Sequence, residues 1–260
     1  MRLLLFVILF TLQNISPALG HETGASTANI SLEERLGATI PDGITFRGEE
    51  GNPVDLRSLM DKPLIVAPVY FHCMHECPLL LNGLAEALGR IDLVKPGRDF
   101  RVVALSFDER ETPALAREKK PNYLAAIGKP FPSDAWRFLT GDNQNVRKFT
   151  DAVGFRFQRD GEDFSHPMTV VVLAPGGKIV RYLYGTSFLP LDVTMAVTEA
   201  GQGKVVRTAG RVLNYCFSYD PLKHTYVFNV LKVVGTVMVL VAGSFFAWLM
   251  ITTKRQRGEY

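Results

Sequence analysis

Apolar positions along this chain fall into short continuous runs, and amphipathic segments with helix-start signals separate them. Residues 64–71 and 100–107 are almost entirely apolar, which is typical of strands buried on both faces of a sheet. Thr112 followed by Pro113 marks a helix start, because threonine caps a helix and proline suits its first position. The pattern predicts strands at 44–46, 54–56, 64–71, 100–107, 136–139, 168–173 and 178–184, and helices at 79–89, 112–127, 143–153 and 190–201.

The order of these elements predicts the class of fold. After a small hairpin, strands and helices alternate, which implies parallel strands, and a final hairpin adds antiparallel ones. We therefore expect an α/β domain with a mixed, mainly parallel central sheet flanked by helices. Ser31 and Glu34 form a capping box, which predicts a short helix before this domain.

Both ends of the chain carry long apolar segments. Arg2, the apolar run after it and the small residues near Gly20 are typical of a secretory signal peptide, predicted at 1–20, with an uncleaved anchor as the alternative. Residues 231–253 contain an uncharged stretch that predicts one C-terminal transmembrane helix, and a basic tail, 254–260, follows it. By the positive-inside tendency this tail is cytoplasmic, so the body of the protein lies on the periplasmic side of the membrane.

The remaining boundaries follow from these segments. Residues 21–38 are predicted to be a linker, 39–205 the folded domain and 206–230 a juxtamembrane segment. The net charge of +3 over 260 residues is too small and too scattered for nucleic-acid binding. Three cysteines are too few for a domain held together by disulfides, so a cysteine pair here needs a chemical explanation.

The segment Cys73-Met74-His75-Glu76-Cys77, with Pro78 behind it, is the strongest candidate for chemistry. It follows the apolar run 64–71, at the carboxyl end of a predicted strand, where sites in open α/β sheets gather. A dithiol in this place predicts a thioredoxin-like fold. If both cysteines lie on the first helical turn, their i, i+4 spacing puts the sulfurs on one face, near the positive end of the helix dipole. Such a pair can form a disulfide or bind one soft metal ion.

Cys73 and Cys77 in a C-x-x-x-C-P pattern, together with His166 just before the strand at 168–173, resemble the Sco/SenC family. The resemblance covers about residues 35–203 and implies a thioredoxin-like fold. It also implies copper, as Cu(I), Cu(II) or both, bound by these two thiolates and this histidine. The implied role is assembly of the copper centre of cytochrome oxidase, with an oxidase subunit as the partner. Independently of the family, two soft thiolates and an imidazole suit Cu(I).

Two features depart from the family pattern. The usual Asp-Pro-x-x-Asp-Thr stretch is represented by residues 108–112, with Glu109 in place of proline and Glu111 in place of aspartate. Asp108 either hydrogen-bonds near the site or serves the turn at the helix start. Pro167 directly after His166 is similar to the proline that faces the dithiol in thioredoxins, which favours disulfide exchange.

Three further residues keep more than one interpretation. His72 and His75 can each be an extra ligand. Otherwise His72 changes the pKa of a thiol, and His75 is exposed to solvent. Cys216 lies in a segment that resembles an extension of membrane-anchored bacterial Sco-like proteins. It is a resolving thiol, an additional copper contact or a buried cysteine among aromatic residues.

We therefore expect a membrane-anchored, extracytoplasmic copper chaperone whose redox-active dithiol cycles between a metal-binding form and a disulfide. The alternative is a thiol-disulfide oxidoreductase, with Cys73 attacking and Cys77 resolving, that maintains the cysteines of an oxidase subunit or a cytochrome. A thiol peroxidase would need an arginine and a threonine around one cysteine, and the pattern does not place them. Whether the protein is an enzyme stays open at this point.

Overall fold

The computed structural model describes residues 30–205 and, beyond them, 217–220, 225–228, 234–235, 238, 241–245 and 248. The predicted signal peptide, Cys216 and the basic tail lie outside the described residues, and the predicted span at 231–253 is described only in part. Within the described residues, no helix combines the length and the apolar character that crossing a membrane requires.

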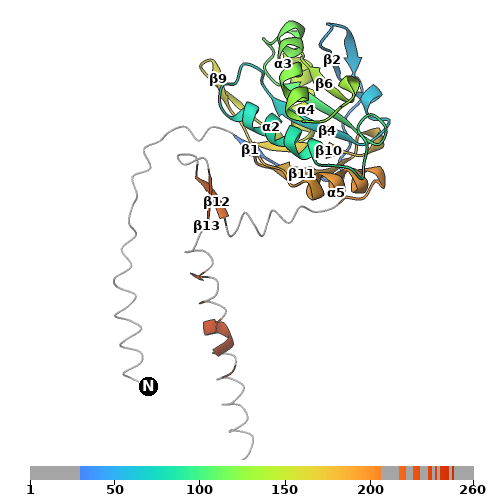
Figure 1. The fold of residues 1–260 in the computed structure, drawn as a ribbon. Coiled ribbons are helices and arrows are strands. Elements are labelled where there is room, and N and C mark those ends of the chain that lie inside the picture. The colour runs from blue at the N-terminus through green and yellow to red at the C-terminus, as the bar shows by residue number, and fades with distance from the viewer. Residues whose placement is uncertain are drawn as a thin grey trace, which may run out of the picture.

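A five-stranded sheet forms the centre of the domain (Figure 1). Its strands, in order across the sheet, are β11 (Ile179–Tyr184), β10 (Thr169–Leu173), β4 (Leu64–Val69), β5 (Arg101–Ser106) and β6 (Trp136–Leu139). β4 pairs in parallel with β5, and β5 with β6, whereas β10 is antiparallel to both β4 and β11. The predicted mixed α/β sheet is confirmed: only β10 runs against the other four strands, so two of the four pairings are parallel and two are antiparallel.

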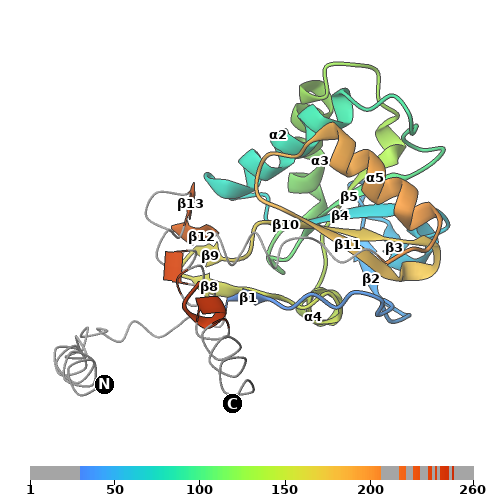
Figure 2. The ribbon, with the colours of Figure 1, turned by 90° about the horizontal axis from the view of Figure 1, so that it is seen from below.

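Helices cover both faces of this sheet (Figure 2). α2 (Glu76–Gly89), α3 (Pro113–Ala126) and α5 (Pro190–Gly201) lie on one side, and α4 (Asn143–Ala152) lies on the other with the short strand β1 (Ser31–Leu32). α2 comes close to the loop before α5 at Gly83, where an added Cβ would stand 1.9 Å from the Thr186 carbonyl oxygen. A glycine is therefore required at this contact.

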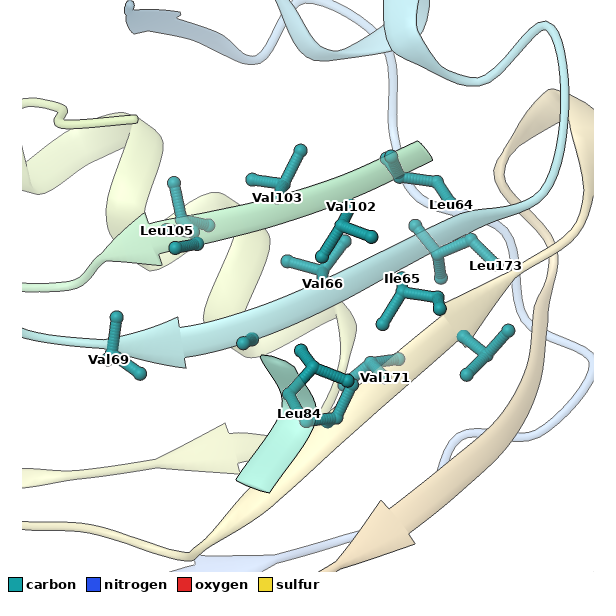
Figure 3. Close-up of a cluster of buried hydrophobic side chains, with 14 of the residues drawn as sticks. Leu64, Ile65, Val66, Val69, Leu84, Val102, Val103, Leu105, Val171 and Leu173 are labelled. Atoms are coloured by element: carbon teal, nitrogen blue, oxygen red, sulfur yellow. The ribbon is translucent and has the colours of Figure 1, made fainter. Parts of the chain in front are cut away.

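The core lies between these layers (Figure 3). All six residues of β4 are buried, which explains why this strand reads as a continuous apolar run rather than as an alternating one. Leu84 of α2 and Val171 of β10 both belong to this cluster of fully buried side chains (Figure 3). Burial of each such Val or Leu side chain contributes about 1.5–3 kcal/mol to the stability of the fold.

The register of β4 and β5 decides where the site forms. Val69, the last residue of β4, lies opposite Ser106, the last residue of β5. The loops that follow these two strands therefore leave the sheet side by side, at its carboxyl edge. This edge brings the Cys73 loop next to the segment 107–112.

Several predicted elements are confirmed, and one is wrong. Thr112 caps α3, its hydroxyl accepting a hydrogen bond from the Leu115 N–H at 3.4 Å, and Pro113 is the first helical residue. The predicted short helix at Ser31–Glu34 is absent, because residues 31–32 form β1, which pairs with β7 (Phe155–Arg156). The backbone hydrogen bonds between β1 and β7 therefore determine the structure here, and the capping signal of Ser31 and Glu34 does not.

The remaining elements are short. The first hairpin is confirmed as β2 (Thr45–Arg47) and β3 (Pro53–Asp55), and the sequence did not predict the hairpin of β8 (Gln158–Asp160) and β9 (Asp163–Ser165). The other short elements are the 3-10 helices η1 (Leu56–Leu59), η2 (Ser133–Ala135) and η3 (Pro175–Gly177), and the paired strands β12 (Phe217–Asp220) and β13 (Thr225–Phe228).

Candidate functional site

The two cysteines lie where β4 passes into α2. Cys77 is the second residue of α2, whereas Cys73 lies in the loop before the helix, so the two do not share its first turn as expected. The Cys73 sulfur accepts a hydrogen bond from the Cys77 N–H at 3.4 Å. This contact satisfies one of the free N–H groups of the helix start, which explains why α2 begins earlier than the predicted residue 79. Both thiols are free and nearly inaccessible, 6% and 1% exposed.

His166 stands beside this pair. It lies between β9 and β10, and β10 pairs with β4, so the topology returns the histidine to the end of the strand that leads to the cysteines. Its Nε2 atom is 3.6 Å from the sulfur of Cys77. Its Nδ1 atom is 3.1 Å from the Pro167 carbonyl oxygen, a contact that suits a protonated Nδ1. In that tautomer Nε2 has its lone pair directed toward the sulfur.

Aromatic rings surround the imidazole. The rings of Tyr70, Phe107 and Phe155 have their centroids 5.8, 5.1 and 6.2 Å from that of His166. This burial lowers the pKa of His166, because an apolar pocket disfavours the charged form. The histidine is therefore neutral at physiological pH and able to act as a ligand or a hydrogen-bond acceptor.

The two thiols differ in protonation. A hydrogen bond from the Cys77 thiol lowers the pKa of Cys73 to about 4, and the backbone N–H groups of Cys77 and His75 add to this effect against burial. Burial raises the pKa of Cys77 well above its usual value, and the neighbouring Cys73 raises it further. At neutral pH the reduced pair therefore consists of a Cys73 thiolate and a Cys77 thiol.

This asymmetry predicts the pH dependence of alkylation. Only the thiolate reacts with iodoacetamide, so the rate at Cys73 should be constant from pH 8 down to about pH 5 and fall below that with a midpoint near pH 4. The rate is measured on the Cys73 peptide by mass spectrometry, with anaerobic, reduced protein. A midpoint near pH 8 to 9, as for an ordinary cysteine, would contradict the assignment of Cys73 as the thiolate.

Polar contacts from Tyr70 and from the segment after β5 hold the β8–β9 hairpin, which leads directly into His166. The Tyr70 hydroxyl donates to the Asp163 carboxylate at 3.1 Å. Arg159 donates to Asp108 at 2.6 Å, and its guanidinium carbon lies 4.2 Å from the centroid of the Phe164 ring. Asp108, which the sequence left between two roles, thus joins this hairpin to the end of β5, and it also accepts from the Arg110 N–H in the turn before α3.

Glu111 is a site residue whose role sequence reasoning missed. Its carboxylate is buried against the loop that carries Cys73 and accepts the N–H groups of Phe71 and His72 at 2.8 and 2.7 Å. The hydroxyl of Ser106 donates to it at 2.6 Å. The only signal in the sequence was its place in the segment 108–112, where the resembling family has aspartate.

The other residues singled out in the sequence lie apart from the sulfurs. The His72 side chain is 71% exposed and its Nδ1 is 3.2 Å from Glu111. His75 is exposed and precedes the first residue of α2 without a side-chain capping bond. Met74 is 82% exposed. None of these side chains contributes a described contact to Cys73, Cys77 or His166.

The donor set of two sulfurs and one imidazole nitrogen suits a soft metal ion. A metal about 2.3 Å from a sulfur and about 2.0 Å from an imidazole nitrogen holds those two atoms about 3.5–3.7 Å apart, for tetrahedral to trigonal angles. The 3.6 Å between Cys77 Sγ and His166 Nε2 matches this separation. Among the described residues, however, no three His, Cys, Asp or Glu side chains already form a metal-binding group.

Comparison with known proteins gives the family and the fold. The family model described as SCO1/SenC matches residues 37–200. A solved protein of Aquifex aeolicus, described as a candidate electron transfer protein, is 34% identical with a TM-score of 0.58, over 65% of this chain and 95% of that one. The comparison with curated proteins found no match.

Two more distant structures are similar in fold. Arabidopsis thaliana ScoI, solved with copper bound, is 20% identical with a TM-score of 0.50, over 62% of this chain and 98% of that one. BsSco, described as having a disulfide switch and as a member of the Sco family of cytochrome c oxidase assembly proteins, is 21% identical with a TM-score of 0.50, over 66% and 99%. At these identities the likeness concerns the mixed α/β fold alone.

Proposed function

Because the chain belongs to the SCO1/SenC family, we propose that it binds copper through Cys73, Cys77 and His166 and delivers it during assembly of cytochrome c oxidase. The observation that carries this proposal is the 3.6 Å contact between Cys77 Sγ and His166 Nε2 at the end of β4. A relative from Arabidopsis thaliana was solved with copper, which supports the choice of metal. The proposed acceptor is a subunit of the oxidase.

Each residue has a distinct part in this function. As Cu(I), the copper would transfer from one thiolate site to another. Its Cu(I)/Cu(II) couple would also exchange one electron. Cys73 offers a thiolate before any metal arrives, because its pKa is about 4. Cys77 keeps its proton until a cation displaces it, and His166 offers a neutral nitrogen from an apolar wall. The burial of both sulfurs limits their contact with solvent oxidants.

Anaerobic titration of the reduced, full-length protein with Cu(I) against a competing chelator tests the proposal. We expect binding of about one copper per chain, because one set of two thiolates and one imidazole satisfies a single Cu(I) ion. Absence of binding under conditions where both thiols are demonstrably reduced would refute the copper function.

We also propose that the protein is exported and anchored by residues 231–253, with its domain on the periplasmic side. The support is the signal-like segment at 1–20 and the basic tail at 254–260, which point to the same orientation. Retention in membranes after an alkaline carbonate wash would agree with an anchor, and release by that wash would contradict it.

A second candidate function is thiol-disulfide exchange with an oxidase subunit or a cytochrome. The ionised Cys73 next to the protonated Cys77 favours it, because exchange needs an attacking thiolate and a resolving thiol. The disulfide switch described for BsSco is a further reason to consider it. Its test is reduction of a disulfide-containing partner peptide by the metal-free protein, which the copper function alone does not require.

A further inference from the structure

A buried carboxylate stands behind the dithiol loop, and neither proposed function assigns it a role. Glu111 lies five residues after the end of β5, and its side chain is 1% exposed. Oε2 accepts from the Phe71 N–H at 2.8 Å and the Ser106 hydroxyl at 2.6 Å. Oε1 accepts from the His72 N–H at 2.7 Å and faces the His72 ring at 3.2 Å.

The two backbone bonds have a geometric consequence. Phe71 and His72 are the residues immediately before Cys73, and their consecutive N–H groups both end on one side chain. A carboxylate held at both oxygens fixes the two peptide planes, since charge-assisted hydrogen bonds are short and directional. The Cys73 backbone then starts from a set direction, while Cys77 is set separately by α2.

We propose that Glu111 is a positioning residue for the dithiol: by holding the Phe71 and His72 backbone it sets the place of Cys73 relative to Cys77. This rests on the proposed function only in taking Cys73 and Cys77 as the reactive pair. A Cys73 held in place next to Cys77 favours the disulfide, because closing it then costs less conformational freedom than in a loop that is free to move.

The first test is Glu111→Gln in the full-length protein. The amide keeps the volume of the side chain, but its NH2 group meets an N–H or hydroxyl donor where the carboxylate had an acceptor. We expect amide hydrogen exchange at Phe71 or at His72 to accelerate at least about tenfold, because the one remaining amide oxygen cannot accept both of these buried N–H groups in their wild-type positions. The reduced dithiol should also gain stability over the disulfide.

The second readout is the equilibrium with glutathione. Two glutathione thiols are oxidised to one glutathione disulfide, and the two electrons reduce the Cys73–Cys77 disulfide. One of the two protons goes to Cys77 and the other to solvent, because Cys73 stays ionised. In Glu111→Gln we expect the equilibrium constant for reduction to rise about tenfold, which is about 30 mV for a two-electron couple.

Glu49 provides a matched control. It is also a buried carboxylate that accepts a backbone N–H, from Phe138 at 2.8 Å, but it pairs with Arg137 and Lys120 and accepts no N–H group of the loop before Cys73. Glu49→Gln should lower the melting temperature yet leave the glutathione equilibrium unchanged. An equal shift in both variants would mean a general loss of stability and would overturn the proposal.

Other outcomes are equally decisive. An equilibrium constant within about twofold of the wild type in Glu111→Gln would refute the positioning role. If that variant does not fold, Glu111→Asp is used, which withdraws the carboxylate by one methylene, and wild-type exchange rates at Phe71 and His72 would then refute it. Failure of the wild type to bind copper would refute the copper function, but the equilibrium of the dithiol with glutathione could still be measured. If the Glu111 variant binds copper and has the wild-type equilibrium constant with glutathione, only the positioning role is refuted.

Discussion

Replacement of Cys73 by serine is expected to weaken copper binding by more than about a hundredfold and to abolish disulfide formation. Loss of a partner that only orients a ligand typically costs about 10- to 100-fold in metal affinity, so loss of the ligand itself should cost more. A hydroxyl is a poor ligand for the soft Cu(I) ion. The fold should persist, because a serine oxygen can still accept the N–H of Cys77 at the start of α2. Chelator competition measures the affinity, and circular dichroism checks the fold.

Met74→Leu is the control for this substitution. Met74 is the neighbouring residue, carries a sulfur and is 82% exposed, so its replacement removes a soft atom from the same loop without disturbing the core. We expect wild-type affinity and a normal disulfide. Copper binding of wild-type strength in Cys73→Ser, or a large loss in Met74→Leu, would show that the ligands are not those proposed.

Replacement of His166 by alanine is expected to separate the two candidate functions. Copper affinity should fall by about a hundredfold or more, because Cu(I) keeps two thiolates but loses its third ligand, and not only a group that orients one. Exchange with a disulfide substrate should continue, since the attacking thiolate of Cys73 draws its low pKa first from Cys77 and not from His166. Both quantities are measured on the same preparation, with His166→Gln as a variant that better preserves the packing against Phe107.

His75→Ala is the matched control for the imidazole. This histidine lies between the two cysteines in the sequence but is exposed, and no described hydrogen bond joins its side chain to the site. Its removal should change neither quantity. Unchanged copper affinity in His166→Ala would argue for simple disulfide exchange, whereas loss of both activities would point to a collapsed pocket around Phe107 and Tyr70.

The strands, helix starts and site residues that could be predicted from the sequence are those that depend on residues nearby in the chain. The apolar run at 64–71 predicts a buried strand because its neighbours cover both faces. Thr112 and Pro113 predict the start of α3, since capping involves only residues within one turn. Cys73 and Cys77 are recognised by their spacing. His166 is harder, because 89 residues separate it from Cys77, and only the resemblance to a family pointed to it.

The rest depends on contacts between distant segments. Ser31 carries a capping signal, yet its backbone pairs with Arg156, and nothing near residue 31 records that pairing. The hairpin before His166 is held by Arg159 reaching Asp108. Glu111 is inconspicuous in sequence, since its role appears only once the ends of β4 and β5 lie side by side. In these three cases the structure depends on which distant segments lie side by side, and a local sequence pattern does not contain that information.

The unequal protonation of the two sulfurs has an electrostatic consequence for loading the proposed cargo. Before loading, the pocket carries the single negative charge of Cys73, with Cys77 and His166 both neutral. Entry of a monovalent cation expels the proton of Cys77, so one positive charge replaces another and the total stays the same. A buried, apolar pocket tolerates such an exchange far better than a change of net charge, which would have to be solvated anew.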